Sequence, residues 1–157
     1  MEKAIINTPL GITEIQGDEN GISKIYIRNE DVKITSKIPS ELKEAAIQLQ
    51  EYFEGKRTHF TIFLHPSGTE FQKKVWQELL NIPFGKTCSY LELSKKLGDV
   101  KAIRAVAAAN GKNPLWIVVP CHRVIGSDGS LTGYAGGLWR KKWLLEHENP
   151  SVQKTLF

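Results

Sequence analysis

The sequence predicts an α+β protein in which a small N-terminal α/β domain precedes a helical C-terminal domain. Three observations support this. Residues 3–28 alternate between apolar and polar types, as strands do; from residue 69 onward, apolar residues recur mainly at helical spacing; and His65-Pro66-Ser67-Gly68 has the composition of a linker. We therefore expect one domain at residues 1–68 and a second at 69–157.

The N-terminal domain is predicted to begin with a three-stranded meander. The strands are expected at 3–7, 12–16 and 22–27, because Pro9-Leu10-Gly11 and the segment 18–21 have the composition of turns. A helix should follow, with Ser40 at its cap position and Gly55 at its end, since apolar residues recur between them near a 3.6 period.

The C-terminal domain is predicted to be mainly helical. Thr69 and Gln72 have the spacing of a capping box at the start of a helix. Two short helices at 89–97 and 100–110, joined by a turn at Gly98, have helix-turn-helix spacing. The wholly apolar run 115–119 is expected to form a buried strand, and a last helix is expected at 138–148.

Composition and charge narrow the classes of protein that this chain can belong to. Its 157 residues are 41% hydrophobic, with no run long enough to span a membrane and no signal-peptide pattern at the N-terminus. We expect a cytoplasmic monomer with reduced cysteines. Residues 1–69 carry eight Lys and Arg against ten Asp and Glu, whereas residues 70–148 carry twelve against seven. This asymmetry indicates a polyanionic partner for the second half, although a solvated basic face would explain it equally well.

The chemically most informative segment is Pro120-Cys121-His122-Arg123, which follows the apolar run. A neighbouring imidazole can lower the pKa of a thiol and make it a nucleophile, but a free cysteine is also a common small core residue. Adjacent strand residues point to opposite faces, so His122 can activate Cys121 only if the backbone turns here or a water bridges them. Glu146 and Glu148 are both candidates for orienting the imidazole.

Collinear motifs from residue 68 to residue 148 resemble one family, the O6-alkylguanine-DNA alkyltransferases, also called methylated-DNA–protein-cysteine methyltransferases. The matching pieces are Gly68-Thr69-Glu70-Phe71-Gln72, Val75-Trp76, Ile82-Pro83-Phe84-Gly85, Ser89-Tyr90, Arg104-Ala105-Val106, Ala109-Asn110-Gly111, Asn113-Pro114, Ile117 to Ile125, Thr132 to Leu138 and Trp143-Leu144-Leu145. The first half is similar to the N-terminal domain of this family more loosely, through residues 51–57, which implies a ribonuclease-H-like fold.

The resemblance implies direct-reversal DNA repair, in which the alkyl group of O6-alkylguanine moves irreversibly and once per molecule to Cys121. It leaves open whether O4-alkylthymine is also a substrate. It implies that Cys121 is the nucleophile, that His122 is its base, acting through a water, and that Glu148 is the carboxylate that orients the imidazole. Tyr90 would be a phenolic donor near the leaving base, and Asn113 would brace the loop that carries Cys121. The residues that it assigns to base binding are Tyr134, Ala135, Gly136 and Val124.

The same resemblance implies that the helix 100–110 lies in the minor groove of duplex DNA, with little sequence preference. Arg104 would take the place of a flipped nucleotide. The other residues expected at this DNA interface are Tyr90, Ala105, Ala109 and Ser127. Lys101, Arg140, Lys141 and Lys142 are candidates for phosphate contacts, although a solvated face explains them equally well.

We expect no cofactor and no metal. The first domain has no Cys, and His59 and His65 fall short of the usual four zinc ligands. Two rival functions remain in view: a cysteine hydrolase that uses Cys121 with His122 or His147, and a non-catalytic binder of alkylated DNA. A binder of this kind would not need Cys121.

Overall fold

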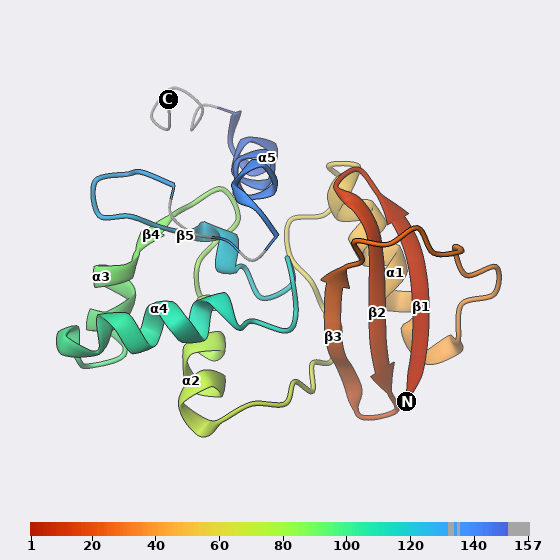
Figure 1. The fold of residues 1–157 in the computed structure, drawn as a ribbon, viewed down its shortest axis with the longest axis horizontal. Helices are drawn as coiled ribbons and strands as arrows, with labels where there is room; N and C mark the ends of the chain where they lie inside the picture. The colour runs from red at the N-terminus through yellow and green to blue at the C-terminus, as the bar shows by residue number, and fades with distance from the viewer. Residues whose placement is uncertain (132–133, 135, 151–157) are drawn as a thin grey trace. The chain divides into compact units, whose positions relative to one another are not determined.

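Three antiparallel strands and one helix form most of the first of two units in the computed structural model, which describes residues 1–131, 134 and 136–150 (Figure 1). The strands β1 (Glu2–Thr8), β2 (Gly11–Asp18) and β3 (Gly21–Ile27) pair in the order β1-β2-β3, which confirms the predicted meander. Helix α1 (Ser40–Phe53) packs against the sheet through buried residues such as Leu42, Leu49 and Tyr52. Its N-cap is Pro39 rather than the predicted Ser40, which is the first helical residue.

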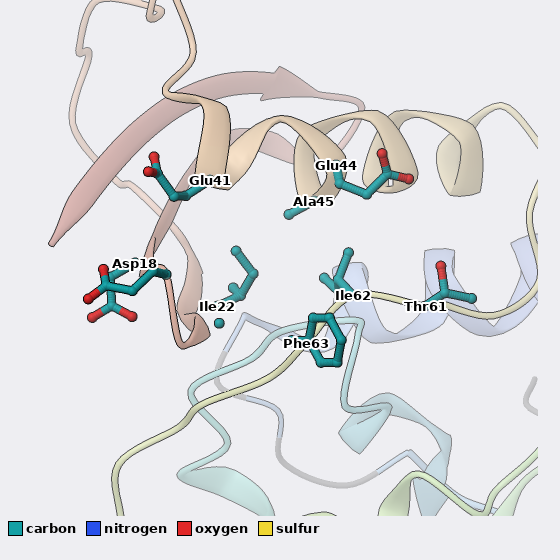
Figure 2. Close-up of a pocket in the computed structure, with 10 residues that line it drawn as sticks. Asp18, Ile22, Glu41, Glu44, Ala45, Thr61, Ile62 and Phe63 are labelled. Carbon is teal, nitrogen blue, oxygen red and sulfur yellow. The ribbon is translucent and has the colours of Figure 1, made fainter.

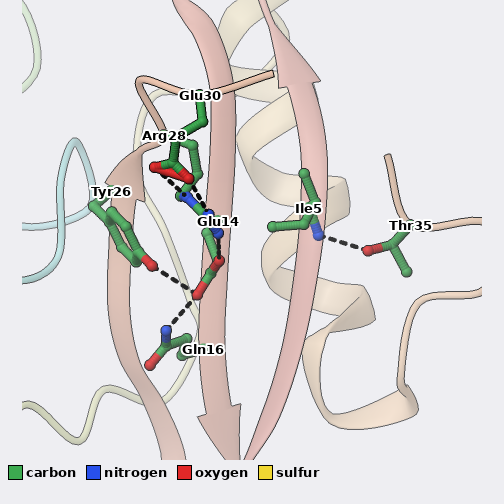
Figure 3. A network of polar contacts seen from close by, with 7 residues as sticks. All are labelled: Ile5, Glu14, Gln16, Tyr26, Arg28, Glu30 and Thr35. Carbon is green, nitrogen blue, oxygen red and sulfur yellow. Dashed lines mark hydrogen bonds and ion pairs between the residues drawn. The ribbon is translucent and has the colours of Figure 1, made fainter. Parts of the chain in front are cut away.

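One face of the sheet carries a polar network centred on Glu14, which is 2% exposed (Figure 3). Tyr26 donates a hydrogen bond of 2.8 Å to its carboxylate, and Gln16 and Arg28 donate others. Burial alone would raise the pKa of Glu14, but these donors outweigh it and hold the pKa below its ordinary value. The carboxylate is therefore ionised and has partners within the sheet, which is consistent with a structural role.

The outer edge of β1 is partly covered by the loop that leads to α1. Thr35 donates its backbone N–H to the carbonyl oxygen of Ile5 at 2.9 Å and accepts the N–H of Ile5 on its hydroxyl at 2.7 Å (Figure 3). Bonds of this kind occupy part of an edge that would otherwise be open to another strand.

The segment Pro114–Val118 belongs to the first unit, although residues on both sides of it belong to the second. Ile25 donates its N–H to the carbonyl of Pro114 at 2.8 Å, and Trp116 donates to the carbonyl of Ile25 at 3.2 Å. The prediction of a strand over 115–119 is wrong. After the single bridge at Leu115 the chain turns, with Ile117 at a φ of 71°. The run is buried as predicted, but prolines at both ends and this turn prevent continued pairing.

The second unit contains the remaining elements and comprises residues 68–113 and those from 119 onward. Its helices are α2 (Glu70–Leu79), α3 (Tyr90–Lys96), α4 (Ile103–Gly111) and α5 (Leu138–Glu148), and its short parallel strands are β4 (Cys88–Ser89) and β5 (Val124–Ile125) (Figure 1). The predicted capping box of Thr69 and Gln72 is confirmed, and Ser89 and Glu92 form a second one at the start of α3.

The helix-turn-helix is formed by α3 and α4, which are joined through Gly98 at a φ of 89°. One 3-10 turn, Val100–Ala102, precedes α4, so the predicted helix 100–110 has a tighter first turn. Helix α2 packs against α4, where the indole N–H of Trp76 donates to the carbonyl of Ala109 at 2.8 Å. Among the described residues, no helix is both long and apolar enough to cross a membrane.

Candidate active site

Cys121 begins a 3-10 turn, Cys121–Arg123, in the second unit and is 7% exposed. The backbone turns here, because Cys121 donates its N–H to Val119 at 2.8 Å and Arg123 donates to Pro120 at 3.0 Å. This local turn removes the objection that neighbouring strand residues must point to opposite faces.

His122 is fully buried and its Nε2 lies 2.7 Å from Oε2 of Glu148. Arg123 binds the same carboxylate with Nε at 2.8 Å and Nη2 at 3.0 Å, and its Nη1 donates to the carbonyl of Ile82 at 2.6 Å. Burial would raise the pKa of Glu148, but His122 and Arg123 outweigh it and hold that pKa well below its ordinary range. Glu148 is therefore the carboxylate that contacts the imidazole.

The tautomer of His122 follows from this contact. An ionised carboxylate accepts a hydrogen bond, so the proton resides on Nε2 and Nδ1 keeps its lone pair. Burial lowers the pKa of His122 despite the opposing effect of Glu148, so the ring is neutral at physiological pH. Within the described part of the chain, Nδ1 has no hydrogen-bond partner. The ring thus keeps one nitrogen able to accept a proton.

The surroundings of the Cys121 thiol have opposing effects on its pKa. Burial raises the pKa, whereas a hydrogen bond with Asn113, the charge of Lys141 and a hydrogen bond with Tyr134 lower it. The net direction is upward, so the resting group is a thiol with several groups around it that favour the thiolate. Asn113 also donates Nδ2 to the carbonyl of Val119 at 2.7 Å, which ties it to the turn before Cys121.

Lys141 is the site residue that the sequence reasoning missed. Its expected role as an exposed phosphate contact is wrong, because the side chain is fully buried. Burial lowers the pKa of Lys141 to about 8, although the charge of Cys121 opposes this. Its Nζ lies 5.9 Å from the ring centre of Tyr90, the first residue of α3. The sequence did contain a sign of its burial: Lys141 precedes Glu148 by two turns of the predicted last helix, so the two side chains project from the same face.

Of the four residues expected to bind the base, Tyr134 and Gly136 precede α5, Val124 lies in β5, and the structure does not describe the fourth. Tyr134 lies near Cys121 and is one of the groups that lower the pKa of its thiol. A Cβ on Gly136 would come within 3.1 Å of the Tyr134 ring, so any larger residue there would crowd the ring. Val124 is fully buried in β5, opposite Cys88. Ala135 lies outside the described residues.

Three of the predicted DNA-contacting residues lie on α4, and they do not share one side of it. Arg104 and Ala105 are exposed, whereas Ala109 is 3% exposed and faces α2. The expectation that Ala109 touches DNA therefore does not fit its position; Ala108 is the exposed small residue near it. Ser127 is exposed in the loop after β5, next to Asp128.

A pocket on the first unit has several acidic lining residues, which would repel a polyanion such as DNA. It lies between α1, the β2–β3 turn and residues 61–63, with an apolar floor that includes Ile22 and Ala45 (Figure 2). Its acidic lining residues are Asp18, Glu19, Glu41 and Glu44. Among the described residues, no three Cys, His, Asp or Glu side chains gather as metal ligands would.

Comparison with known proteins identifies the family. Residues 1–66 match the ribonuclease-like domain of 6-O-methylguanine DNA methyltransferase, and residues 70–150 match its DNA-binding domain. The chain belongs to the 6-O-methylguanine DNA methyltransferase family. The α+β fold with a ribonuclease-like first domain, expected from the sequence, is therefore confirmed.

Individual members of the 6-O-methylguanine DNA methyltransferase family are similar over nearly the whole chain. A methylated-DNA–protein-cysteine methyltransferase of Methanosarcina acetivorans is 46% identical over 153 residues, covering 94% of this chain and 98% of the relative. The crystal structure of Mycobacterium tuberculosis O6-methylguanine methyltransferase has a TM-score of 0.84 at 40% identity, covering 95% of this chain and 93% of that one. The structure of Mycobacterium tuberculosis OGT in complex with DNA has a TM-score of 0.86 at 39% identity, covering 100% and 99%.

Proposed function

We propose that this protein repairs DNA directly, by accepting on Cys121 the alkyl group of O6-alkylguanine. The observation that carries the proposal is the arrangement around one thiol. Cys121 has Asn113, Tyr134 and Lys141 as groups that favour its thiolate, and the next residue is a neutral histidine held by an ionised glutamate. The names of its relatives, methylated-DNA–protein-cysteine methyltransferases, agree with this chemistry.

The first step is loss of the thiol proton. His122 Nδ1 accepts it, directly or through a water, and the imidazolium that forms is stabilised by the carboxylate 2.7 Å from Nε2. Arg123 keeps that carboxylate ionised and fixed in place. The charge of Lys141 favours the thiolate electrostatically.

The second step is an in-line attack by the sulfur on the saturated carbon bonded to guanine O6. A sulfur–carbon bond forms, the carbon–oxygen bond breaks, and its electron pair leaves with the guanine, which takes up one proton. We assign this proton donation to the Tyr90 hydroxyl, whose ring lies 5.9 Å from the Lys141 ammonium. Asn113 holds the turn that carries Cys121. Tyr134, Ala135, Gly136 and Val124 form the proposed base pocket.

The product is a thioether on Cys121, and this bond is stable to hydrolysis under ordinary conditions. Each molecule therefore reacts once. This distinguishes the proposal from a cysteine hydrolase, which would regenerate its thiol. His147, the other base considered for such an enzyme, stacks on Trp143 with ring centres 4.8 Å apart.

The substrate is proposed to be duplex DNA from which the damaged base has been flipped out. Cys121 is only 7% exposed, so a base within the duplex cannot reach it. The exposed face of α4, with Arg104, Ala105 and Ala108, is assigned to the minor groove, and Arg104 to the gap that the base leaves. Tyr90 and Ser127 would add contacts. A monomer suffices for this reaction, and the need for a reduced thiol supports a cytoplasmic location, because thiols stay reduced there.

The test mixes the protein with duplex DNA that contains one O6-methylguanine, then digests it with trypsin and weighs the peptides. Cleavage after Lys112 and Arg123 isolates residues 113–123, which contain Cys121 but not Cys88. We expect this peptide to gain the mass of one methyl group, up to one per protein, and Cys121→Ala to abolish the gain while DNA binding persists. An unmodified wild-type peptide despite DNA binding would overturn the transfer reaction and favour a damage-binding protein.

A further inference from the structure

Trp139 lies in the first turn of α5 and is 56% exposed, while the adjacent Arg140 stacks on it. The guanidinium carbon of Arg140 lies 4.4 Å from the centre of the indole ring. A cation over an aromatic face at this distance is held in one orientation, which a long exposed side chain would not otherwise keep.

The oriented Arg140 side chain reaches the loop that precedes α5. Its Nη1 donates to the carbonyl oxygen of Gly136 at 2.7 Å. A Cβ built on Gly136 would stand 3.1 Å from the ring of Tyr134 and 3.5 Å from the Cδ of Arg140. Gly137 also donates its N–H to the carbonyl of Tyr134 at 2.9 Å. Tyr134 is thus tied to the start of α5 through its own carbonyl, and Gly136 is tied there by Arg140.

We infer that Trp139 and Arg140 act together as a positioning pair that holds Tyr134 and Gly136 in the conformation that binds the alkylated base. The inference rests on the proposed function, because Tyr134 is assigned to the base pocket there. A loop that is already ordered binds its ligand more tightly, since less conformational entropy is lost on binding. The pair therefore sets the affinity for the base, whereas Cys121, His122 and Lys141 set the rate of transfer.

The experiment separates these two effects with two substrates. One is duplex DNA with a single O6-methylguanine, and the other is the nucleoside O6-methyl-2′-deoxyguanosine, which has no phosphodiester backbone. Methylation of the peptide 113–123 is followed over time at several substrate concentrations. This gives a half-saturating concentration and a limiting rate for each substrate.

We expect Trp139→Ala to raise the half-saturating concentration roughly two- to fivefold for both substrates, with little change in the limiting rate. Arg140→Ala, which also removes the bond to Gly136, should raise it about tenfold. Trp139→Phe should restore most of the affinity, because phenylalanine keeps an aromatic face. Arg140→Lys should not, because lysine lacks the planar fork. Leu138→Ala, at an exposed neighbour outside the stack, is the matched control.

Two results would overturn the inference while leaving the proposed function intact. If Trp139→Ala weakens only the duplex substrate, Trp139 contacts DNA instead of holding the loop. If neither substrate is affected, the pair has no role in binding. Failure of the wild-type protein to gain a methyl group would instead overturn the proposed function, and the inference with it.

Discussion

At the scale of single residues, the unusual feature is a fully buried lysine beside the proposed nucleophile. Burial lowers the pKa of Lys141 to about 8, and burial raises the pKa of the Cys121 thiol. Each group would be less costly as an ion if the other were ionised, because opposite charges attract strongly where water is excluded. Lys141 therefore favours the thiolate at the step where the thiolate is needed.

Lys141→Met tests this role with a side chain of similar length and no charge. Without the ammonium the pKa of Cys121 rises further, so methyl transfer at pH 7 should slow about tenfold and its rate should increase at higher pH than in the wild type. Lysine loses its charge above its pKa of about 8, so the two proteins should converge there. The measurement is the rate of methylation of peptide 113–123 from pH 6 to pH 9. Lys43→Met, on the exposed face of α1, is the control, and equal profiles for Lys141→Met and wild type would contradict the role.

At the scale of elements, α4 has two faces that serve different purposes. Val106 and Ala109 are buried against the rest of the second unit, while Arg104, Ala105 and Ala108 are exposed. Small exposed side chains let a helix approach a surface closely, and one long cation among them can reach beyond that surface. The same nine-residue helix can therefore be packed on one side and bind DNA on the other.

Arg104→Ala separates recognition of DNA from the chemistry of transfer. If Arg104 fills the gap left by a flipped base, transfer from duplex DNA should fall at least about tenfold, because the unstacking energy is no longer offset. Transfer from the nucleoside O6-methyl-2′-deoxyguanosine should stay unchanged. Lys43→Ala, which removes the same charge from the exposed face of α1, is the control. An equal loss with both substrates would place Arg104 in the catalytic machinery instead.

Helix α5 shows how one element serves several parts of the site. Lys141 and Glu148 are seven residues apart, which is about two turns, so both project from the same face toward the 3-10 turn at Cys121. Trp139 and Arg140 lie at its start, where Arg140 stacks on Trp139 and donates a hydrogen bond to Gly136 in the preceding loop. The position of this single helix thus affects both the nucleophile and the proposed base pocket.

At the scale of the whole molecule, the stability of the fold depends on the same buried charges as the reaction. Glu148 has its pKa lowered in the folded state, so it stabilises the fold above its unfolded pKa of about 4.5, and this is lost as the pH falls. His122 also has a lowered pKa, so the unfolded chain takes up a proton first as the pH falls through about 6.5. Both effects destabilise the protein in acid.

We therefore expect the free energy of unfolding to decrease from pH 7 to pH 3 in denaturant titrations. Glu148→Gln should cost about 3 kcal/mol at pH 7, because Arg123 is left as a buried charge without its carboxylate. The variant should also vary less with pH below about 4.5, since its Glu148 contribution is gone. Glu146→Gln, two residues away and only partly buried, is the control. A variant with an unchanged pH dependence would show that Glu148 does not contribute as described.

The sequence alone determined the features that depend on neighbours along the chain. The three strands followed from alternation and turn residues, the start of α2 from the capping box of Thr69 and Gln72, and the start of α5 from the glycine-rich stretch that precedes it. Cys121 and His122 were chosen from four consecutive residues and the motifs around them. Local steric and hydrogen-bonding preferences are enough to specify such features.

Only the tertiary structure decided what each side chain faces. Lys141 was expected at the surface and is buried, Ala109 was expected at the DNA interface and lies against α2, and the run 115–119 turns instead of continuing as a strand. The residues around His122 left Glu146 and Glu148 open, the family resemblance implied Glu148, and the distance of 2.7 Å from His122 to Glu148 agrees with it. The physical reason is that burial and pairing depend on segments far away in sequence, which periodicity along one helix does not record.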